Sequence, residues 1–145
     1  MIIGIGIDIV SVQRMEELRV QEGDRFLNRV FTRREVETAG ARAHLDERLA
    51  ARFAAKEAAM KALGTGWREG VHFTQIEVRK HQTGQPEILL SGKALERAEE
   101  LGVTDIHVSL THDADRAVAV VIMEGDPGSP ASSDPGRAVG RDAPA

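Results

Sequence analysis

Several residue types and patterns are absent from this chain of 145 residues. It contains no cysteine, which excludes disulfides, thiolate catalysis and cysteine-based zinc sites. It has no tyrosine and only one tryptophan and four phenylalanines, so aromatic platforms for stacking nucleic-acid bases are poorly supported. No window approaches 18 consecutive apolar residues, so we expect no membrane-spanning helix. The apolar start lacks a basic flank and contains Asp8, which argues against a signal peptide. The sequence predicts a soluble cytosolic protein.

Charge and length narrow the class further. The net charge is −4, from 19 basic and 23 acidic residues, and this balance argues against a general nucleic-acid binder. The length suits one domain with a hydrophobic core. Four of the five prolines fall after residue 124, where large apolar residues are nearly absent. We therefore predict a folded domain over residues 1–124 and a disordered tail over residues 125–145.

The first ten residues predict a strand, because β-branched residues dominate them. Side chains of a strand alternate, so Ile3, Ile5, Ile7 and Ile9 share one face, and Gly4, Gly6 and Asp8 share the other. The two glycines would let another element approach closely on the face that carries Asp8.

A long helix is predicted over residues 45–63, where alanine, leucine, lysine and glutamate dominate and Gly64 supplies the end. Glu57 falls within its apolar stripe, between Phe53 and Met60. A carboxylate there needs a partner, and the helix is the natural neighbour of the glycine face of the first strand. Asp8 and Glu57 together would then suit Mg²⁺, which is typically held by one or two carboxylates plus waters and phosphates. Two alternatives stay open at this point: Asp8 as a helix cap, and Glu57 as a partner of Lys61.

The remaining pattern predicts an α+β domain: a mostly antiparallel sheet packed against a long central helix. Ser11 and Thr32 stand where helices of about 12–21 and 33–40 would begin, and Thr32 has capping-box spacing. Ser91 is expected to cap a further helix. Strands are expected over residues 71–80, 87–91, 106–111 and 117–123, with a glycine-rich loop over 64–70.

Several of these segments together resemble holo-acyl-carrier-protein synthase, the small trimeric branch of the 4′-phosphopantetheinyl transferases. The resemblance covers roughly residues 2–123 and rests on segments in family order: Gly4-Ile5-Gly6-Ile7-Asp8-Ile9-Val10, Phe31-Thr32, Arg52-Phe53-Ala54-Ala55-Lys56-Glu57-Ala58 with Lys61-Ala62, Gly64-Thr65-Gly66, Gly84-Gln85-Pro86 and His107-Val108-Ser109-Leu110-Thr111-His112-Asp113.

The resemblance implies a transfer of phosphopantetheine from coenzyme A to a serine of apo acyl carrier protein, with 3′,5′-ADP as the leaving group. The carrier would serve fatty-acid biosynthesis, with polyketide carriers as an alternative. Asp8 and Glu57 are implied as Mg²⁺ ligands, Glu57 as the base for the serine proton, directly or through a water. Lys61 would neutralise a phosphate oxygen, although a solvated surface lysine is the alternative.

Coenzyme A contacts are also implied. Arg52 and Lys56 are four residues apart on the predicted helix and could meet an anion together, the alternative being an exposed basic face. A basic residue is further expected near positions 42–48, with Arg42, His44 and Arg48 as candidates. The remaining predicted contacts are Lys61, Gly64, Gly66, Pro86, Ser109, Thr111 and His112.

The carrier is implied to be a small acidic protein. We expect it to dock on the helix after the first strand, through Arg14, Met15, Leu18 and Arg19. The resemblance also implies a homotrimer with active sites between subunits, and no nucleic-acid or membrane partner.

Two other functions are compatible with parts of the pattern. One is a Mg²⁺-dependent nucleotide diphosphohydrolase, which would consume coenzyme A or nucleotides with water and need no carrier. The other is a non-catalytic oligomer that binds coenzyme A or a carrier protein, in which Glu57→Gln would leave function intact.

Overall fold

The computed structural model describes residues 1–40, 43–66 and 70–128. The elements follow the chain in this order: β1 (Ile2–Ser11), α1 (Val12–Glu22), α2 (Asp24–Val30), α3 (Arg33–Ala39), α4 (Leu45–Leu63), a 3₁₀ turn (Phe73–Gln75), β2 (Ile76–Lys80), β3 (Pro86–Leu90), α5 (Gly92–Leu101), β4 (Val103–His112) and β5 (Arg116–Gly125). The predicted α+β class is confirmed.

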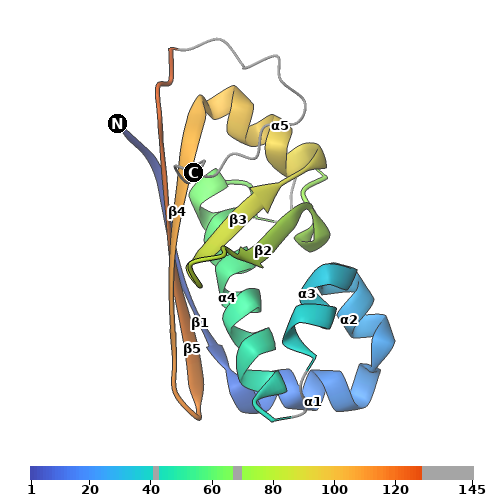
Figure 1. The fold of residues 1–145 in the computed structure, drawn as a ribbon. Helices are drawn as coiled ribbons and strands as arrows, with labels where there is room; N and C mark the ends of the chain where they lie inside the picture. The colour runs from blue at the N-terminus through green and yellow to red at the C-terminus, as the bar shows by residue number, and fades with distance from the viewer. Residues whose placement is uncertain (41–42, 67–69, 129–145) are drawn as a thin grey trace.

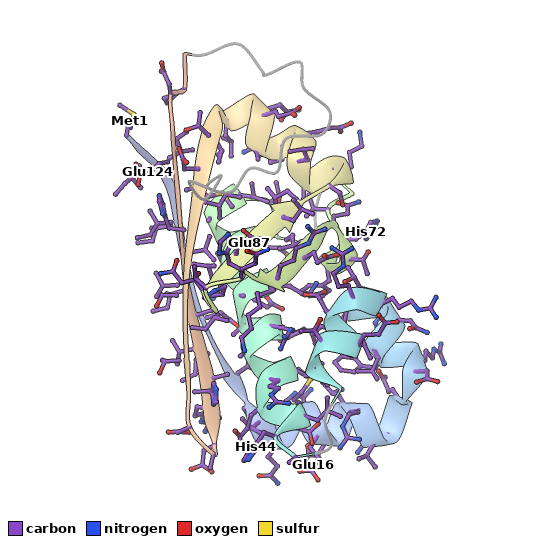
Figure 2. The ribbon with its side chains drawn as sticks, in the orientation of Figure 1. Met1, Glu16, His44, His72, Glu87 and Glu124 are labelled. Carbon is purple, nitrogen blue, oxygen red and sulfur yellow. The ribbon has the colours of Figure 1, made fainter. Side chains whose placement is uncertain are left out.

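The first and the last strand of the folded part lie side by side in one sheet. A three-stranded antiparallel sheet has the order β1-β5-β4, so the first strand pairs with the last. Figure 2 shows Met1 beside Glu124 at one end of this pair, where the Gly125 N–H donates to the Met1 carbonyl. The β2–β3 hairpin forms a second antiparallel sheet.

Helix α4 lies between these two sheets (Figure 1). Eleven of its side chains are buried, and alanine supplies most of them. Alanine lets neighbouring elements approach a helix closely, so α4 packs on several sides instead of along a single stripe. Its predicted end is confirmed, because Gly64 adopts a left-handed conformation with φ of 75°.

The close approach predicted for the glycine face of β1 is confirmed. A Cβ atom built on Gly4 would collide with the Ala62 carbonyl oxygen, and one on Gly6 with the Ala58 carbonyl oxygen. The backbone of β1 therefore rests directly on α4, and only glycine fits at these two positions. This contact brings Asp8 to the helix that carries Glu57.

Helix starts were predicted well at two positions. The Ser11 hydroxyl accepts a hydrogen bond from the Arg14 N–H, and Thr32 and Glu35 form a reciprocal capping box. At Ser91 the helix begins where predicted, with Gly92 as its first residue, but the Ser91 side chain makes no cap hydrogen bond, and the Gln75 Oε1 atom accepts from the Ala94 N–H instead.

Two boundaries also differ from the prediction. The strand expected from residue 71 begins at Ile76, because Phe73–Gln75 forms a 3₁₀ turn. Gly125, assigned to the tail, belongs to β5, and the Asp126 N–H donates to the Gly102 carbonyl. The folded part thus extends past residue 124. The rest of the predicted tail, 129–145, and the loop residues 67–69 lie outside the described residues.

Candidate active site

An acidic and a basic side chain meet where β1 lies on α4. The Lys61 Nζ atom is 3.2 Å from the Asp8 Oδ1 atom and also donates to the Ile7 carbonyl at 2.9 Å. Glu57 stands one helical turn before Lys61 and is half-buried. The alternative in which Lys61 pairs with Glu57 is not what the structure shows, because the ion pair of Lys61 is with Asp8. The β1–α4 contact therefore gathers Asp8, Glu57 and Lys61.

The electrostatics of Glu57 reflect this crowding. Burial raises the pKa of the Glu57 carboxyl, the nearby negative charge of Asp8 raises it further, and Lys61 acts in the opposite direction. Two carboxylates that repel each other in a partly buried place are stabilised by a cation between them. The donor set consists of carboxylate oxygens, which Mg²⁺ prefers. Within the described ranges no group of three or more acidic, histidine or cysteine side chains converges, so any metal here would have to complete its shell with water or phosphate.

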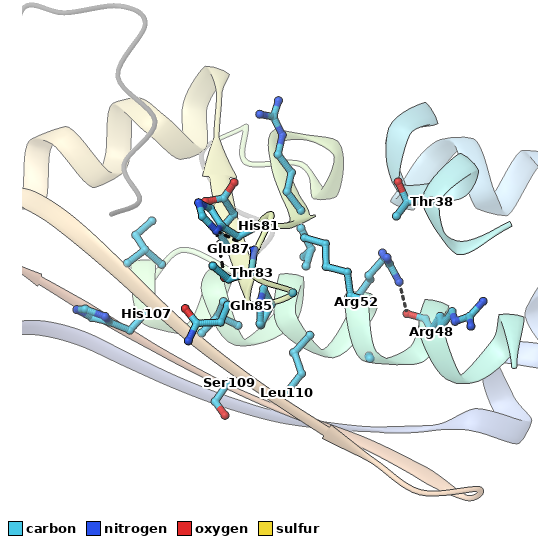
Figure 3. A pocket seen from close by; sticks show the side chains of 18 of the residues that line it. Thr38, Arg48, Arg52, His81, Thr83, Gln85, Glu87, His107, Ser109 and Leu110 are labelled. Atoms are coloured by element: carbon cyan, nitrogen blue, oxygen red, sulfur yellow. Dashed lines mark hydrogen bonds between the residues drawn. The ribbon is translucent and has the colours of Figure 1, made fainter. Parts of the chain in front are cut away.

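A second feature lies on the opposite side of α4. An open pocket of about 1150 Å³ is bounded by α4, the β2–β3 hairpin and β4 (Figure 3). Four of the side chains lining it are arginine or lysine, against one carboxylate, that of Glu87. The basic set is Arg48, Arg52, Arg79 and Lys80, and the histidines are His81, His107 and His112. Apolar residues also line it, namely Val78, Ile106, Val108 and Leu110. The pocket is thus suited to an anion with an apolar part.

Arg52 is the most unusual of these side chains. Its Nη1 atom donates to the Arg48 carbonyl at 3.2 Å, shown as a dashed line in Figure 3. Its Nε atom is buried and has no hydrogen-bond partner. Burial lowers the pKa of the Arg52 guanidinium, and Arg48 lowers it further against the attraction of Glu35. A buried donor without an acceptor is costly, and an anionic ligand would satisfy it.

Lys56 does not share the pocket with Arg52, contrary to the pairing that the sequence suggested. Its side chain is 0% exposed, and its Nζ atom lies 2.6 Å from the Glu35 Oε1 atom. Burial lowers the pKa of Lys56, and Glu35 opposes this effect. An ammonium enclosed in the core cannot meet an anion in the pocket. Lys56 is therefore withdrawn from the set of predicted coenzyme A contacts.

The other predicted contacts divide between different places. Pro86, Ser109 and His112 line the pocket, while Thr111 is exposed on β4. Gly64 and Gly66 follow α4 beyond Lys61 and do not line the pocket. Among the basic candidates near the start of α4, Arg48 lines the pocket, His44 precedes α4 with φ of 64°, and Arg42 lies outside the described residues.

Sequence reasoning missed Glu47. Its Oε2 atom lies 3.3 Å from the His44 Nδ1 atom and 3.7 Å from the His112 Nδ1 atom, so it would form an ion pair with either imidazole in its protonated form. No local signal pointed to this contact, because His112 is 65 residues away in the chain, at the end of a strand paired through β5.

The predicted docking set on α1 is only partly exposed. The Arg14 side chain is exposed, and the Leu18 side chain, one helical turn later, is half-buried. Met15 is buried in the core, so it supports α1 and cannot contact a partner directly. Arg19 makes a two-pronged ion pair with Asp46, at 2.6 and 3.0 Å, which ties α1 to the start of α4.

Comparison with known proteins agrees with this architecture. The family model of the 4′-phosphopantetheinyl transferase superfamily matches residues 4–121. A holo-[acyl-carrier-protein] synthase of Solibacter usitatus is 47% identical over 124 residues, which cover 86% of this chain and 99% of the relative.

Solved structures give the same result. The synthase of Neisseria meningitidis has a TM-score of 0.77 at 38% identity, covering 86% of this chain and 99% of that one. The Helicobacter pylori synthase in complex with coenzyme A has a TM-score of 0.73 at 32% identity, covering 83% and 99% respectively. The chain belongs to the 4′-phosphopantetheinyl transferase superfamily. The relatives that it matches along nearly their whole length are holo-acyl-carrier-protein synthases.

Across the described part of the chain, no helix has the length and apolar character needed to span a membrane.

Proposed function

We propose that this protein transfers the 4′-phosphopantetheine group of coenzyme A to a serine of apo acyl carrier protein, releasing 3′,5′-ADP. The observation that carries the proposal is the cluster of Asp8, Glu57 and Lys61 at the β1–α4 contact. It stands in a chain that matches synthases of this name along 99% of a relative's length. A carrier of the fatty-acid type is the proposed acceptor, and the cytoplasm the proposed location.

Asp8 and Glu57 would hold Mg²⁺. When bound, this ion would supply positive charge to the diphosphate and to the leaving group. The half-buried carboxylate of Glu57 would take the proton of the carrier serine at an Oε atom, directly or through a water. The ammonium of Lys61, 55% exposed while it pairs with Asp8, would face a phosphate oxygen. Positioning and charge neutralisation are thus the main contributions of the chain.

The basic pocket would hold the nucleotide end of coenzyme A. Arg52 offers an Nε–H without a partner, and Arg48 adds a second guanidinium one turn earlier. His112 also lines the pocket, with the Glu47 carboxylate 3.7 Å from its Nδ1 atom, and Pro86 lines the wall formed by the hairpin. A phosphate would satisfy the arginines through charge-assisted hydrogen bonds, while the apolar lining would accept the adenine.

The acidic cluster and the basic pocket lie on different sides of α4, and none of Asp8, Glu57 and Lys61 lines the pocket. We propose that one subunit supplies the cluster and a neighbour supplies the pocket within a homotrimer. The outer face of the three-stranded sheet supports this assembly. On β1, the side chains of Ile5, Ile7 and Ile9 are 64%, 61% and 63% exposed.

The apolar surface continues from β1 onto β5 and is bordered by polar residues of β4. These isoleucines pair with Ile122, Val120 and Val118 of β5, which in turn pair with His107, Ser109 and Thr111 of β4. Figure 1 shows this sheet edge-on, and no helix or strand of the described part covers its outer side. A continuous apolar face of this kind marks an interaction site. In an assembly built on this face, Ser109 and Thr111 of β4 would meet a neighbouring subunit.

The carrier is proposed to dock on α1 through Arg14 and Leu18. Arg14 is exposed, and within the described ranges its guanidinium has no ion-pair partner, so it remains available to an acidic surface.

Product analysis tests the proposed reaction. The protein is incubated with coenzyme A and Mg²⁺, with and without apo acyl carrier protein, and 3′,5′-ADP is measured by chromatography. Transfer predicts 3′,5′-ADP only with the carrier and its loss with EDTA. Release of 3′,5′-ADP or another nucleotide without the carrier would show the hydrolase instead. Binding of coenzyme A without any product would show the non-catalytic binder.

A further inference from the structure

Helix α4 carries three basic residues at four-residue spacing, Arg48, Arg52 and Lys56. Side chains at this spacing lie along one face of a helix. The first two line the basic pocket. Lys56 lies beyond the pocket wall, enclosed in the core. A charge in such a place requires an explanation, because isolated burial of an ammonium is costly.

All hydrogen-bonding groups of Lys56 are satisfied. The Nζ atom contacts the Glu35 Oε1 atom at 2.6 Å, the Phe73 carbonyl at 3.0 Å and the Ile76 carbonyl at 2.5 Å. An ammonium has three donors, and each has an acceptor here. Its charge is matched by one buried carboxylate, that of Glu35.

Both carboxylate oxygens of Glu35 are also engaged in hydrogen bonds. Its Oε1 atom also accepts from the Thr32 N–H at 2.9 Å, and its Oε2 atom accepts from the Val78 N–H at 3.0 Å. The pair therefore joins the start of α3, the middle of α4 and strand β2. Through Val78, which lines the pocket, Glu35 is fixed beside the pocket wall, and its negative charge raises the pKa of the Arg52 guanidinium against the effect of burial.

In contrast to Lys56, Arg52 has a buried donor without an acceptor. Its Nε atom is buried without a partner, and its one hydrogen bond to the chain in the described residues is donated by Nη1 to the Arg48 carbonyl. Arg52 stands one helical turn before Lys56. If Lys56 were neutral, Glu35 would be an uncompensated buried carboxylate, and Arg52 would be the cation one turn away on the same helix.

We infer that Lys56 is a positioning residue: by neutralising Glu35 in the core, it leaves the Arg52 guanidinium free to bind a phosphate group in the pocket. The inference rests on the proposed coenzyme A site and deepens it. Lys56 contacts no substrate, and its effect on nucleotide binding passes through Glu35 and Arg52. The role explains why a basic residue stands at a position without access to solvent.

Two variants separate this role from simple support of the fold. Lys56→Met removes the ammonium and keeps much of the volume, so Glu35 is left to attract Arg52. Lys56→Met combined with Glu35→Gln removes both charges and should return Arg52 to the pocket. Glu35→Gln alone is the control for the loss of the carboxylate. Folding of each variant is checked by circular dichroism and thermal unfolding.

The probe is 3′,5′-ADP, and its binding is measured by titration calorimetry before any assay of transfer. We expect Lys56→Met to weaken 3′,5′-ADP binding about tenfold or more, the effect of losing a charge-assisted contact. The double variant should recover to within about threefold of the natural chain. In the transfer assay, KM for coenzyme A should rise in Lys56→Met, while KM for the carrier stays unchanged. Equal losses in both variants, or unchanged binding in Lys56→Met, would overturn the inference.

A second measurement covers the case in which Lys56→Met does not fold. In the natural chain, the ¹⁵Nε resonance of Arg52 should shift when 3′,5′-ADP is added, and Arg52→Gln should weaken binding. An unresponsive Arg52 in a protein that binds 3′,5′-ADP would overturn the inference while the proposed function stands. A natural chain that binds neither 3′,5′-ADP nor coenzyme A would overturn both.

Discussion

Gly6 of β1 lies directly against the carbonyl of Ala58 in α4, and a Cβ atom at Gly6 would occupy the space of that oxygen. Because both partners are backbone, neither can move without shifting its whole element. The substitution Gly6→Ala should therefore lower the free energy of unfolding by at least about 2 kcal/mol, the effect of overpacking a close contact. It should also lower activity, since the contact sets the distance between Asp8 and Glu57.

Urea unfolding checks this prediction, with Gly84→Ala as the control. Gly84 has open space around it, but its φ of 88° makes alanine strained there by about 1 kcal/mol. A Gly6→Ala loss no larger than that of Gly84→Ala would contradict the described packing.

The ion pair between Lys61 and Asp8 predicts that a substitution of Lys61 lowers the rate of transfer and leaves the stability of the fold nearly unchanged. Lys61 is 55% exposed, so its pair contributes at most about 1 kcal/mol to the fold. Lys61→Met should leave the thermal midpoint nearly unchanged and lower kcat/KM for transfer by about 100-fold or more, because a positive charge at the phosphate is lost. Lys61→Arg, which retains the charge, should recover part of the rate. Steady-state kinetics measure both variants, and full activity of Lys61→Met would remove Lys61 from the site.

The exposed isoleucines of β1 predict how assembly can be broken. Ile7→Asp places a charge in the centre of the outer sheet face, so it should convert the proposed trimer to monomers and abolish transfer. The matched control is Val20→Asp on α1, which is also exposed, at 68%, but lies off the sheet. Light scattering coupled to size-exclusion chromatography gives the mass of each. A natural chain that is monomeric yet fully active would refute the proposal of shared sites.

Arg14 on α1 predicts how the carrier is recognised. Arg14→Glu should raise KM for the carrier, leave KM for coenzyme A unchanged, and flatten the salt dependence of kcat/KM, because an attractive charge is replaced by a repulsive one. Lys93→Glu on α5 is the control, since this exposed lysine lies on a different helix from the proposed dock. Equal effects of the two substitutions would show a nonspecific influence of net charge.

The parts of the site that the sequence could predict depend on short-range rules. Alternation in the first strand placed Gly4, Gly6 and Asp8 together, and helical spacing placed Glu57 and Lys61 one turn apart. The capping box at Thr32 follows equally local chemistry. These relations need only the geometry of one strand or one helix turn, and the structure reproduces them.

The fate of Lys56 could not be predicted in the same way. Spacing correctly placed it one turn after Arg52, but spacing does not show which elements cover a helix. The many alanines of α4 are a signal for close packing on several sides, and the capping-box spacing from Thr32 predicts only a local role for Glu35. Its second role, as the partner of Lys56, depends on the β2–β3 hairpin closing over both. Likewise, the separation of the acidic cluster from the basic pocket follows from packing on two sides of α4.

Mass spectrometry of the intact carrier protein tests the central claim most directly. Apo acyl carrier protein is incubated with coenzyme A, Mg²⁺ and this protein, beside the Glu57→Gln variant and a sample with EDTA. The account predicts that the carrier gains the mass of one phosphopantetheine group with the natural chain, and that this gain is lost or strongly slowed in the other two samples. A carrier that keeps its mass with the natural chain, or gains it at the full rate with Glu57→Gln, would contradict the account.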